Sequence, residues 1–146
     1  MSGDFSVLSV NISARVGEQK KPVQRAVLRE GHGIVGDAHA GDWHRQVSLL
    51  ADEDIETLRG RGIEIGWGDF AENITTRGID LASLPVGSRL AIGTALLEIT
   101  QIGKECHTGC AISRTTGDCV MPRKGVFARV ITGGEIGRES LGHYDF

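Results

Sequence analysis

The chain has 146 residues, 40% of them hydrophobic and 24% charged, and a formal net charge of -3 at pH 7. A chain of this length can bury one core and is short for two, so we expect a single domain over residues 1–146. The charge gives no general electrostatic reason to bind nucleic acid or a membrane surface, and no run approaches the roughly 18 uninterrupted apolar residues of a membrane helix. The first residues lack the pattern of a secretion signal, so we predict a cytoplasmic protein with no nucleic-acid or membrane partner.

The predicted elements are mostly short strands. The chain has 21 glycines and few aromatic residues, which favours a barrel or sandwich with many tight turns over a helical bundle. One helix is predicted after the third strand, with Asp52 as its cap and Gly60 and Gly62 at its end, and Gly93-Thr94 is expected to form a hairpin turn. The fold class is therefore expected to be mainly β, a β-rich α+β barrel with a few short helices. The predicted strands are Phe5–Ile12, Gln24–Arg29, Gln46–Leu50, Arg89–Ile92, Ala95–Ile102 and Val126–Ile131.

A polar segment follows the second predicted strand. The glycines from Gly31 to Gly36 have the spacing of a dinucleotide-binding turn, but the next residues do not continue as a helix, so that fingerprint fails in context. Two interpretations of the following polar side chains stay open. They could be metal ligands, or they could form a polar loop in which Asp42 pairs with Arg45. The side chains concerned are Asp37, His39, Asp42, His44 and Arg45.

A second polar segment lies in mid-chain, between Gly68 and Gly78. Its carboxylate, amide and hydroxyl groups could match the donors and acceptors of a polar heterocycle, and Arg77 could meet an anion. The alternative is a loop whose polar side chains satisfy their own backbone. The residues that carry these groups are Glu72, Asn73, Thr75 and Thr76.

The segment from Lys104 to Cys119 holds all three cysteines of the chain and follows a predicted strand. Three thiols cannot all pair within one chain, so at least one is free, binds a metal or reacts. A reducing cytoplasm makes a disulfide framework the less favoured interpretation. If residues 105–114 are helical, Cys106 and Cys110 share one face and could both point at one ligand.

Three interpretations of these cysteines remain. A zinc site built from Cys106, Cys110, Cys119 and one histidine has enough donor atoms but lacks paired Cys-x-x-Cys knuckles. A reactive Cys106 is the sharper interpretation, because Lys104, His107 and a helix start would each lower the pKa of its thiol. The third is that some thiols are small buried apolar groups, which we favour for Cys119.

Six motifs occur in register along the chain. They are Gly-Ile-Val-Gly-Asp-Ala-His-Ala-Gly at 33–41, Arg-Gln-Val-Ser-Leu-Leu at 45–50, Phe-Ala-Glu-Asn-Ile-Thr-Thr at 70–76, Leu-Pro-Val-Gly-Ser-Arg-Leu at 84–90, Gln-Ile-Gly-Lys-Glu-Cys-His at 101–107 and Gly-Val-Phe-Ala-Arg-Val at 125–130. Together they resemble the MOSC domain, the module found at the C-terminus of molybdenum cofactor sulfurases and as small free-standing bacterial proteins. The likeness runs from about Gly31 to Gly134 and is greatest to the small stand-alone type with a later Met-Pro, here Met121-Pro122.

The resemblance implies a MOSC-type β-barrel that binds the molybdenum cofactor (molybdopterin), a pterin with a dithiolene and a phosphate. The family's functional cysteine falls on Cys106, which would carry a persulfide for the cofactor or, as in reductase relatives, coordinate molybdenum directly. The stretch on the pterin-binding side falls on residues 71–75, so Glu72, Asn73 and Thr75 are expected to bind the cofactor. Ala71 stands where the family has glycine, and if that position needs a positive φ the loop is expected to differ locally.

The expected function is therefore to bind the molybdenum cofactor and carry sulfur on Cys106 for its sulfuration or maturation. The alternatives are a molybdenum-dependent reductase component and a non-catalytic cofactor carrier. A separate pyridoxal-phosphate cysteine desulfurase would supply the sulfur, and the cofactor or a molybdoenzyme would receive it. His107 is expected to help keep Cys106 deprotonated, and Cys110 to resolve its persulfide.

Two further expectations concern the rest of the chain. The cofactor's phosphate would meet basic side chains, for which the candidates are Lys104, Arg123, Lys124 and Arg129. The C-terminus departs from relatives, which commonly close with Gly-Asp and another short strand, whereas this chain has Gly137-Arg-Glu-Ser140. The last barrel strand is therefore expected to be altered or missing.

Overall fold

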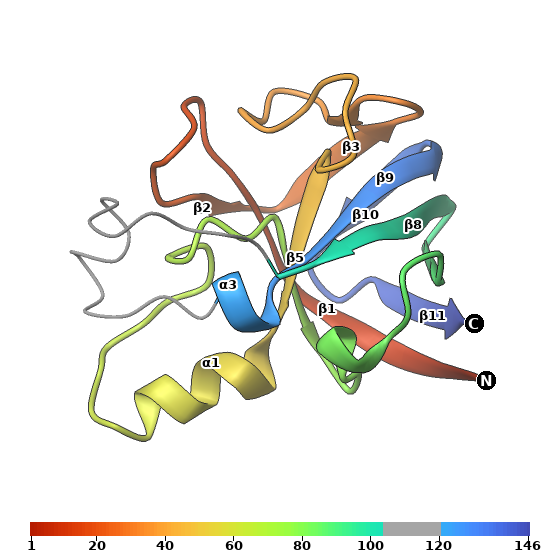
Figure 1. Cartoon of the computed structure of the whole chain (residues 1–146). Helices are drawn as coiled ribbons and strands as arrows, with labels where there is room; N and C mark the ends of the chain where they lie inside the picture. The colour runs from red at the N-terminus through yellow and green to blue at the C-terminus, as the bar shows by residue number, and fades with distance from the viewer. Residues whose placement is uncertain (104–120) are drawn as a thin grey trace.

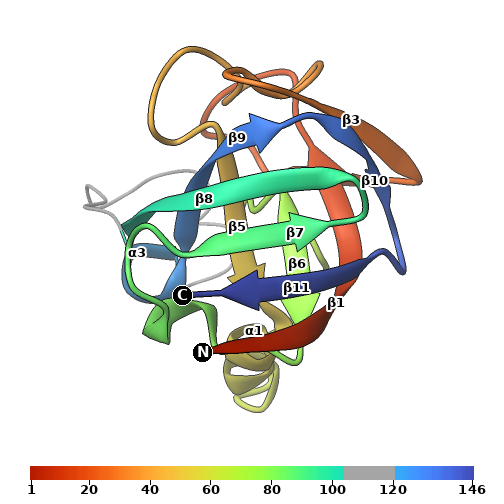
Figure 2. The same cartoon turned by 90° about the vertical axis from the view of Figure 1, so that its right-hand side faces the viewer.

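Strand pairing closes a barrel in the computed structural model, which describes residues 1–103 and 121–146. Among these residues the hydrogen-bonded order is β11-β7-β8-β9-β5-β6-β1, and β11 also pairs with β1, so seven strands form the closed sheet (Figures 1 and 2). β2 extends the sheet beyond β1, and β10, β3 and β4 form a separate three-stranded sheet. The strands are β1 Ser2–Ile12, β2 Lys21–Val23, β3 Arg25–Arg29, β4 Gly33–Ile34, β5 Val47–Ala51, β6 Ile74–Arg77, β7 Arg89–Ile92, β8 Ala95–Ile102, β9 Val126–Thr132, β10 Gly134–Gly137 and β11 Leu141–Asp145.

The predicted mainly β barrel with short helices is confirmed. All six predicted strands exist, with shifts of one to three residues at some ends, and the hairpin turn at Gly93-Thr94 joins β7 to β8. The helices are α1 Asp52–Arg59, the 3₁₀ turn η1 Leu81–Ser83 and α3 Met121–Lys124. No helix within the described ranges is long and apolar enough to cross a membrane.

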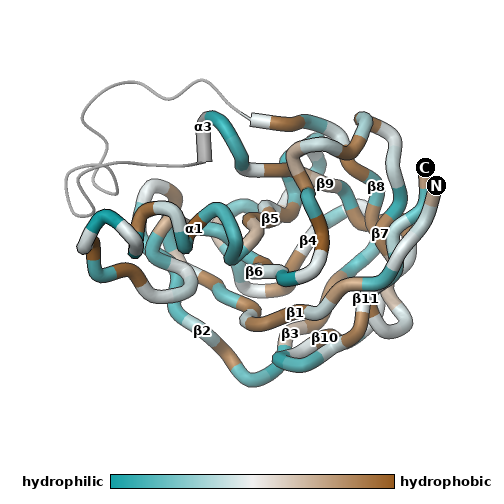
Figure 3. The backbone as a smooth tube through the Cα atoms, turned by 90° about the horizontal axis from the view of Figure 1, so that it is seen from below, coloured by the Kyte–Doolittle hydropathy of each residue, from teal (hydrophilic) through white to brown (hydrophobic). Residues whose placement is uncertain are grey.

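Two apolar clusters, one inside the barrel and one outside it, fix these elements. Alternate residues of the strands fill the interior, and the brown apolar stretches in Figure 3 recur along the strands. β5 is buried at every position because its outer face is also covered. The cover comes from α1 and the segment 63–71, which bury Leu50 and Phe127 in the outer cluster. Burying Ile55 and Leu58 of α1 there contributes roughly 1.5–3 kcal/mol each.

The expectation that the last barrel strand is altered or missing is wrong. β11 pairs antiparallel with β7 on one side and with β1 on the other, so it is the strand that closes the barrel. The turn before it is tight, because Glu139 adopts a positive φ of 69° and its backbone N–H donates to the Val7 carbonyl (2.9 Å). The two chain ends lie side by side as a result (Figure 2).

Asp52 does not cap α1, contrary to the sequence-based expectation. Ala51 occupies the cap position without a side-chain hydrogen bond, and Asp52 is the first helical residue. Its carboxylate instead accepts hydrogen bonds from Arg59, Arg77 and the Trp67 indole. Burial would raise the pKa of Asp52, but these donors outweigh it and hold the pKa below its usual value. The side chain therefore ties α1 to β6 and to the segment 63–71.

Candidate functional site

The cysteine segment itself lies outside the described residues, so Lys104, Cys106, His107, Cys110 and Cys119 are not placed. The chain leaves the described part at Gly103 and returns to it at Met121. The Gly103 N–H donates to the Gly125 carbonyl (2.6 Å), and Ile102 is paired with Val126 across β8 and β9. Both ends of the segment that holds Cys106 are therefore fixed at one end of the β8–β9 ladder.

Gln101 links this end of the ladder to the polar loop at 37–45. Its side-chain oxygen lies 2.8 Å from Nε2 of His44, while its amide nitrogen donates to the Gly103 carbonyl (2.8 Å). The Thr100 hydroxyl donates to the carbonyl of His44. Thr100 and Gln101, shortly before the cysteine segment, thus hydrogen-bond to the loop that carries His44.

Arg45 lies between two aromatic rings in that loop. Its guanidinium carbon is 4.7 Å from the ring centre of Trp43 and 5.6 Å from that of Phe127, which are cation–π contacts. The buried Nε of Arg45 has no hydrogen-bond partner, and no carboxylate pairs with Arg45 within residues 1–103 and 121–146. The pair between Asp42 and Arg45 that one of the two interpretations allowed is absent from the described residues. Arg45 therefore offers a positive charge and an unpaired N–H group to which an anion could bind.

A buried lysine organises the other end of the loop. Nζ of Lys20 donates to Oγ of Ser13 (3.0 Å) and Oδ1 of Asp37 (2.8 Å), and lies 3.0 Å from Nδ1 of His39. Burial would raise the pKa of Asp37, but the hydrogen bond and charge of Lys20, with backbone N–H groups, hold it below its usual value. The His39 ring stacks on Trp43 with ring centres 6.4 Å apart. We call Lys20, Asp37, His39, Trp43 and Arg45 the loop cluster.

The metal interpretation of the 37–45 segment gains no support. No group of three or more His, Cys, Asp or Glu side chains in the described part of the chain could hold a metal ion. Asp37 is engaged by Lys20 and by the backbone N–H groups of Ser13 and His39, and His44 by Gln101. The geometry is that of a polar loop with cationic and aromatic side chains.

The mid-chain polar residues are in a different environment, because they form a fully buried network. Asn73 accepts from the Ser48 backbone N–H (2.9 Å) and donates to the Asn11 carbonyl (3.1 Å). The Thr75 hydroxyl donates to Oε2 of Glu72 (2.8 Å). Glu72, Asn73 and Thr75 pair with protein groups and have no exposed area, whereas the equally buried Thr76 hydroxyl has no hydrogen-bond partner in the described part of the chain. The buried network consists of Ser9, Asn11, Ser48, Glu72, Asn73 and Thr75.

The pKa of Glu72 is unusual within this network. Burial raises its pKa to about 7, although backbone N–H groups of Gly68 and Phe70 and the Thr75 hydroxyl partly counter the effect. Through its hydrogen bonds to these backbone N–H groups, the Glu72 carboxyl group holds the preceding turn in place. In that turn Ala71 adopts a positive φ of 63°, so the position does use the conformation that suits glycine. In this chain an alanine adopts that conformation.

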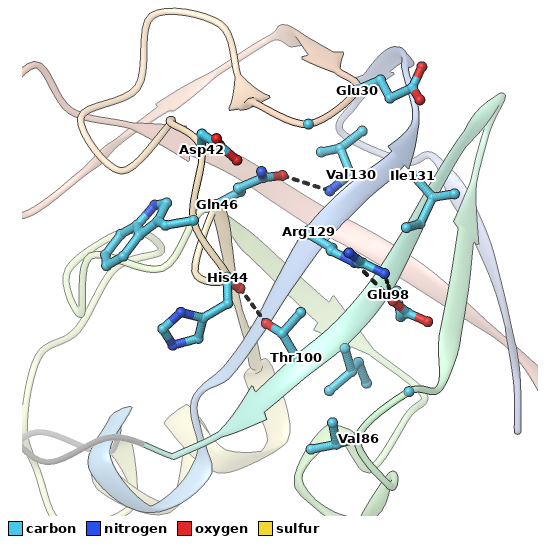
Figure 4. Close-up of a pocket in the computed structure, with 14 residues that line it drawn as sticks. Glu30, Asp42, His44, Gln46, Val86, Glu98, Thr100, Arg129, Val130 and Ile131 are labelled. Carbon is cyan, nitrogen blue, oxygen red and sulfur yellow. Dashed lines mark hydrogen bonds and ion pairs between the residues drawn. The ribbon is translucent and has the colours of Figure 1, made fainter.

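Arg129 lies on the outer face of the barrel in a pocket of about 620 Å³ (Figure 4). It donates to Glu98 through Nε (2.9 Å) and Nη2 (2.6 Å), so a protein carboxylate already meets its charge. The same pocket is also lined by Trp43 of the loop cluster and by His44, whose ring contacts Trp43. The other described phosphate candidates, Arg123 and Lys124, are exposed on α3.

Lys20, Trp43 and Phe127 were not predicted from the sequence as site residues. Nothing around Lys20 distinguishes it from its neighbour Lys21, and its burial depends on Asp37, 17 residues away. The Phe-Ala-Arg run at 127–129 was assigned only to a strand. A tryptophan beside alternating polar residues was the one usable signal, because an indole next to Arg45 favours a cation–π contact.

Comparison with known proteins identifies the family. The MOSC domain matches residues 36–139, a range that includes the loop cluster apart from Lys20, most of the buried network and the cysteine segment. The chain belongs to the MOSC domain family. MOSC domains are associated with the molybdenum cofactor. No curated protein matches the chain.

Several solved structures share this MOSC fold. The YuaD protein from Bacillus subtilis superposes with a TM-score of 0.84 at 17% identity, covering 100% of this chain and 98% of that one. YiiM from Geobacillus stearothermophilus has a TM-score of 0.74 at 18% identity, with 97% of this chain and 75% of YiiM covered. YiiM from Escherichia coli has 0.67 at 16%, with 97% and 70% covered. At these identities the likeness supports the fold alone.

Proposed function

We propose that this MOSC protein binds the molybdenum cofactor and carries sulfur as a persulfide on Cys106 for cofactor sulfuration or maturation. One observation carries the proposal beyond family membership. The segment that holds Cys106 begins beside the 37–45 loop, because the side chain of Gln101 contacts both His44 of that loop and Gly103. A thiol delivered to that region would have the Arg45 guanidinium in the same loop, and cations stabilise thiolates and anionic ligands.

The loop cluster suits an anionic group such as the cofactor's phosphate or dithiolene. The Arg45 Nε is a buried donor without an acceptor in the described part of the chain, and its guanidinium packs against the rings of Trp43 and Phe127. Arg45 is therefore the residue we propose to hold the anion, with Lys104 as a further candidate. When bound, the cofactor would supply the molybdenum–sulfur chemistry. Glu72, Asn73 and Thr75 would contribute by fixing the backbone of residues 68–76.

The sulfur step balances without an added oxidant. The Cys106 thiolate attacks the outer sulfur of a persulfide on a pyridoxal-phosphate cysteine desulfurase, the donor's S–S bond breaks, and the donor leaves as a thiolate. If Cys110 then attacks the inner sulfur on Cys106, a Cys106–Cys110 disulfide forms and hydrosulfide leaves for the cofactor or a molybdoenzyme. The two thiolates supply the two electrons, so a later reduction must restore them.

Intact mass measurement tests the persulfide directly. After anaerobic incubation with a cysteine desulfurase and cysteine, the wild-type chain should gain one sulfur atom. Cys106→Ser should gain none, Cys119→Ser should gain as much as wild type, and Cys110→Ser should gain it but release it more slowly. A gain that survives in Cys106→Ser would place the persulfide on another thiol and overturn the proposal.

Cofactor binding tests the role of Arg45. Anaerobic incubation with cofactor released from a denatured molybdoenzyme, followed by gel filtration and pterin fluorescence, should show binding that falls at least about tenfold in Arg45→Met. Arg89→Met on β7 is the matched control and should bind like wild type. The Arg45→Met protein should lose only about 1 kcal/mol of unfolding free energy, because it breaks no ion pair among described residues. Equal binding by both variants would remove Arg45 from the site.

The alternative functions give different results in these two experiments. A reductase component with Cys106 as a molybdenum ligand would retain cofactor through gel filtration and lose it in Cys106→Ser. A non-catalytic carrier would exchange the cofactor and accept no persulfide.

A further inference from the structure

Gln46 holds an unpaired hydrogen-bond donor in the pocket on the outer face of the barrel (Figure 4). The residue is only 3% exposed, and its side-chain oxygen accepts from the backbone N–H of Val130 (2.9 Å). Because an N–H group can donate only to the amide oxygen, this bond fixes which end of the amide is the nitrogen. The amide nitrogen therefore points away from that N–H, and it has no acceptor in residues 1–103 and 121–146.

This amide nitrogen is open to the pocket. Among the described side chains, the only polar atoms that are both fully enclosed and unpaired are Nε of Arg45 and the hydroxyl of Thr76. The unpaired nitrogen of Gln46 is not one of them, so it borders the open volume of the pocket that its side chain lines. Buried side chains normally satisfy their polar groups, so a buried amide with a donor facing a pocket suits a ligand that carries an acceptor.

The charges around this donor favour a cation. Three acidic side chains and one arginine line the pocket, and the arginine, Arg129, already pairs with Glu98. The remaining carboxylates, on Glu30 and Asp42, are exposed and make no ion pair in the described part of the chain. An anion would be repelled by this excess of negative charge, whereas an ammonium, amidinium or guanidinium group would be attracted by it.

Hydrogen bonds to one residue bring Glu30 and Gln46 together. The Val130 carbonyl accepts from the backbone N–H of Gly31 (3.1 Å), while the Val130 N–H donates to Gln46. Glu30, the residue before Gly31, is therefore held beside the amide of Gln46. Asp42 precedes Gln46 by four residues, and Figure 4 shows both carboxylates toward the top of the view, at the end of the pocket where this amide lies.

We propose that this pocket is a second binding site, for a small organic cation that also carries a carbonyl oxygen. Gln46 donates to the carbonyl, and the Glu30 and Asp42 carboxylates pair with the positive group. The pocket volume of about 620 Å³ lies within the roughly 300–1,000 Å³ of small-molecule sites, and apolar side chains from β8 and β9 can contact the carbon skeleton. The site differs from the anion site proposed at Arg45, because it attracts the opposite charge.

Three matched compounds test the proposal on the uniformly ¹⁵N-labelled full chain. N-acetylagmatine carries a guanidinium and an amide carbonyl, butylguanidinium carries only the cation, and N-butylacetamide carries only the carbonyl. At constant ionic strength, N-acetylagmatine should saturably shift the side-chain NH₂ signals of Gln46 and bind about fivefold tighter than either fragment. Those signals are assigned by their loss in Gln46→Glu, which keeps an acceptor for the Val130 N–H. Shifts that do not saturate, or equal affinities for N-acetylagmatine and butylguanidinium, would overturn the proposal.

Variants of the two carboxylates test the same site without removing an ion pair among the described residues. Glu30→Gln combined with Asp42→Asn should weaken N-acetylagmatine binding about fivefold and leave N-butylacetamide binding unchanged, because only the negative charge is lost. Glu18→Gln, on an exposed loop outside the pocket, is the matched control and should bind like wild type. Equal affinity of the double variant and wild type for N-acetylagmatine would overturn the proposal. Neither experiment involves Cys106, so both outcomes are independent of persulfide formation.

Discussion

The buried network and the loop cluster have similar residue types and opposite surroundings. In the network, Asn73 and Glu72 have no exposed area and direct their polar atoms to protein groups. In the loop cluster, Arg45 has a buried Nε that meets no acceptor in the described residues. Polar groups whose partners are all internal stabilise a fold, whereas an unmet donor beside aromatic rings can serve a ligand. Hydrogen-bond partners, more than residue type, separate scaffold from site.

The largest effect on stability should come from the network. Asn73→Ala removes the acceptor of the Ser48 N–H and the donor to the Asn11 carbonyl, and leaves both groups buried. Each unsatisfied buried group costs roughly 1–3 kcal/mol, so we expect a loss of about 4 kcal/mol in the free energy of unfolding. Urea denaturation followed by circular dichroism would measure it.

Asp42→Ala is the matched control from the other region. Asp42 is exposed and makes no ion pair in the described residues, so its removal should change stability by less than about 0.5 kcal/mol. If Asn73→Ala and Asp42→Ala cost the same, the contrast between the two regions would be wrong.

A smaller effect should come from the protonation of Glu72. Its pKa in the folded chain is about 7, against an ordinary value of 4.5, because burial disfavours the charged form. The folded state therefore binds the proton more tightly than the unfolded state, and stability falls as pH rises from 4.5 through 7. A shift of this size corresponds to about 3 kcal/mol.

Urea denaturation of wild type and Glu72→Gln at pH 5 and pH 8 isolates this contribution. Glutamine keeps an acceptor for the Phe70 N–H and stays neutral, so the wild type should lose about 3 kcal/mol more than the variant between the two pH values. Asp37 and Asp52 have lowered pKa values, so their contribution is lost only in more acidic solution. Parallel pH profiles for the two proteins would mean that Glu72 is charged in the fold throughout this range.

Most of the barrel could be predicted from the sequence, because its longer strands have a recognisable local residue pattern. β7 and β8 were predicted with correct ends, since alternating apolar residues flank a short glycine turn. β6 was missed because Thr75 and Thr76 resemble ligand-binding residues, and only the closed barrel buries them. β11 was missed because it alternates weakly and gains its order by pairing with β7 and β1.

The candidate site was harder to predict from the sequence, because its side chains contact residues that are far away along the chain. One of the two interpretations of the 37–45 segment paired Arg45 with Asp42, three residues away, but Arg45 contacts Phe127 on β9. Asp52 was expected to cap its own helix, but Arg77 on β6 binds it. Local reasoning assigns a charged residue its nearest partner in sequence, whereas the fold supplies a nearer partner in space.

A further, smaller effect is predicted at Ala71, in the turn before Glu72, where its carbonyl accepts from the Ser48 hydroxyl of the buried network. A positive φ costs a non-glycine residue roughly 1–2 kcal/mol, and Ala71 pays this at φ 63° while its methyl group packs in the outer apolar cluster. In Ala71→Gly the relief of strain is offset by the lost methyl burial and by a more flexible unfolded chain, so stability should stay within about 1 kcal/mol of wild type. Ala71→Val combines a β-branched side chain with the same positive φ and adds bulk to a filled cluster, so it should lose about 2 kcal/mol. Thermal denaturation of the three proteins would measure the order, and a valine variant as stable as wild type would show that residues 68–72 can adopt another backbone.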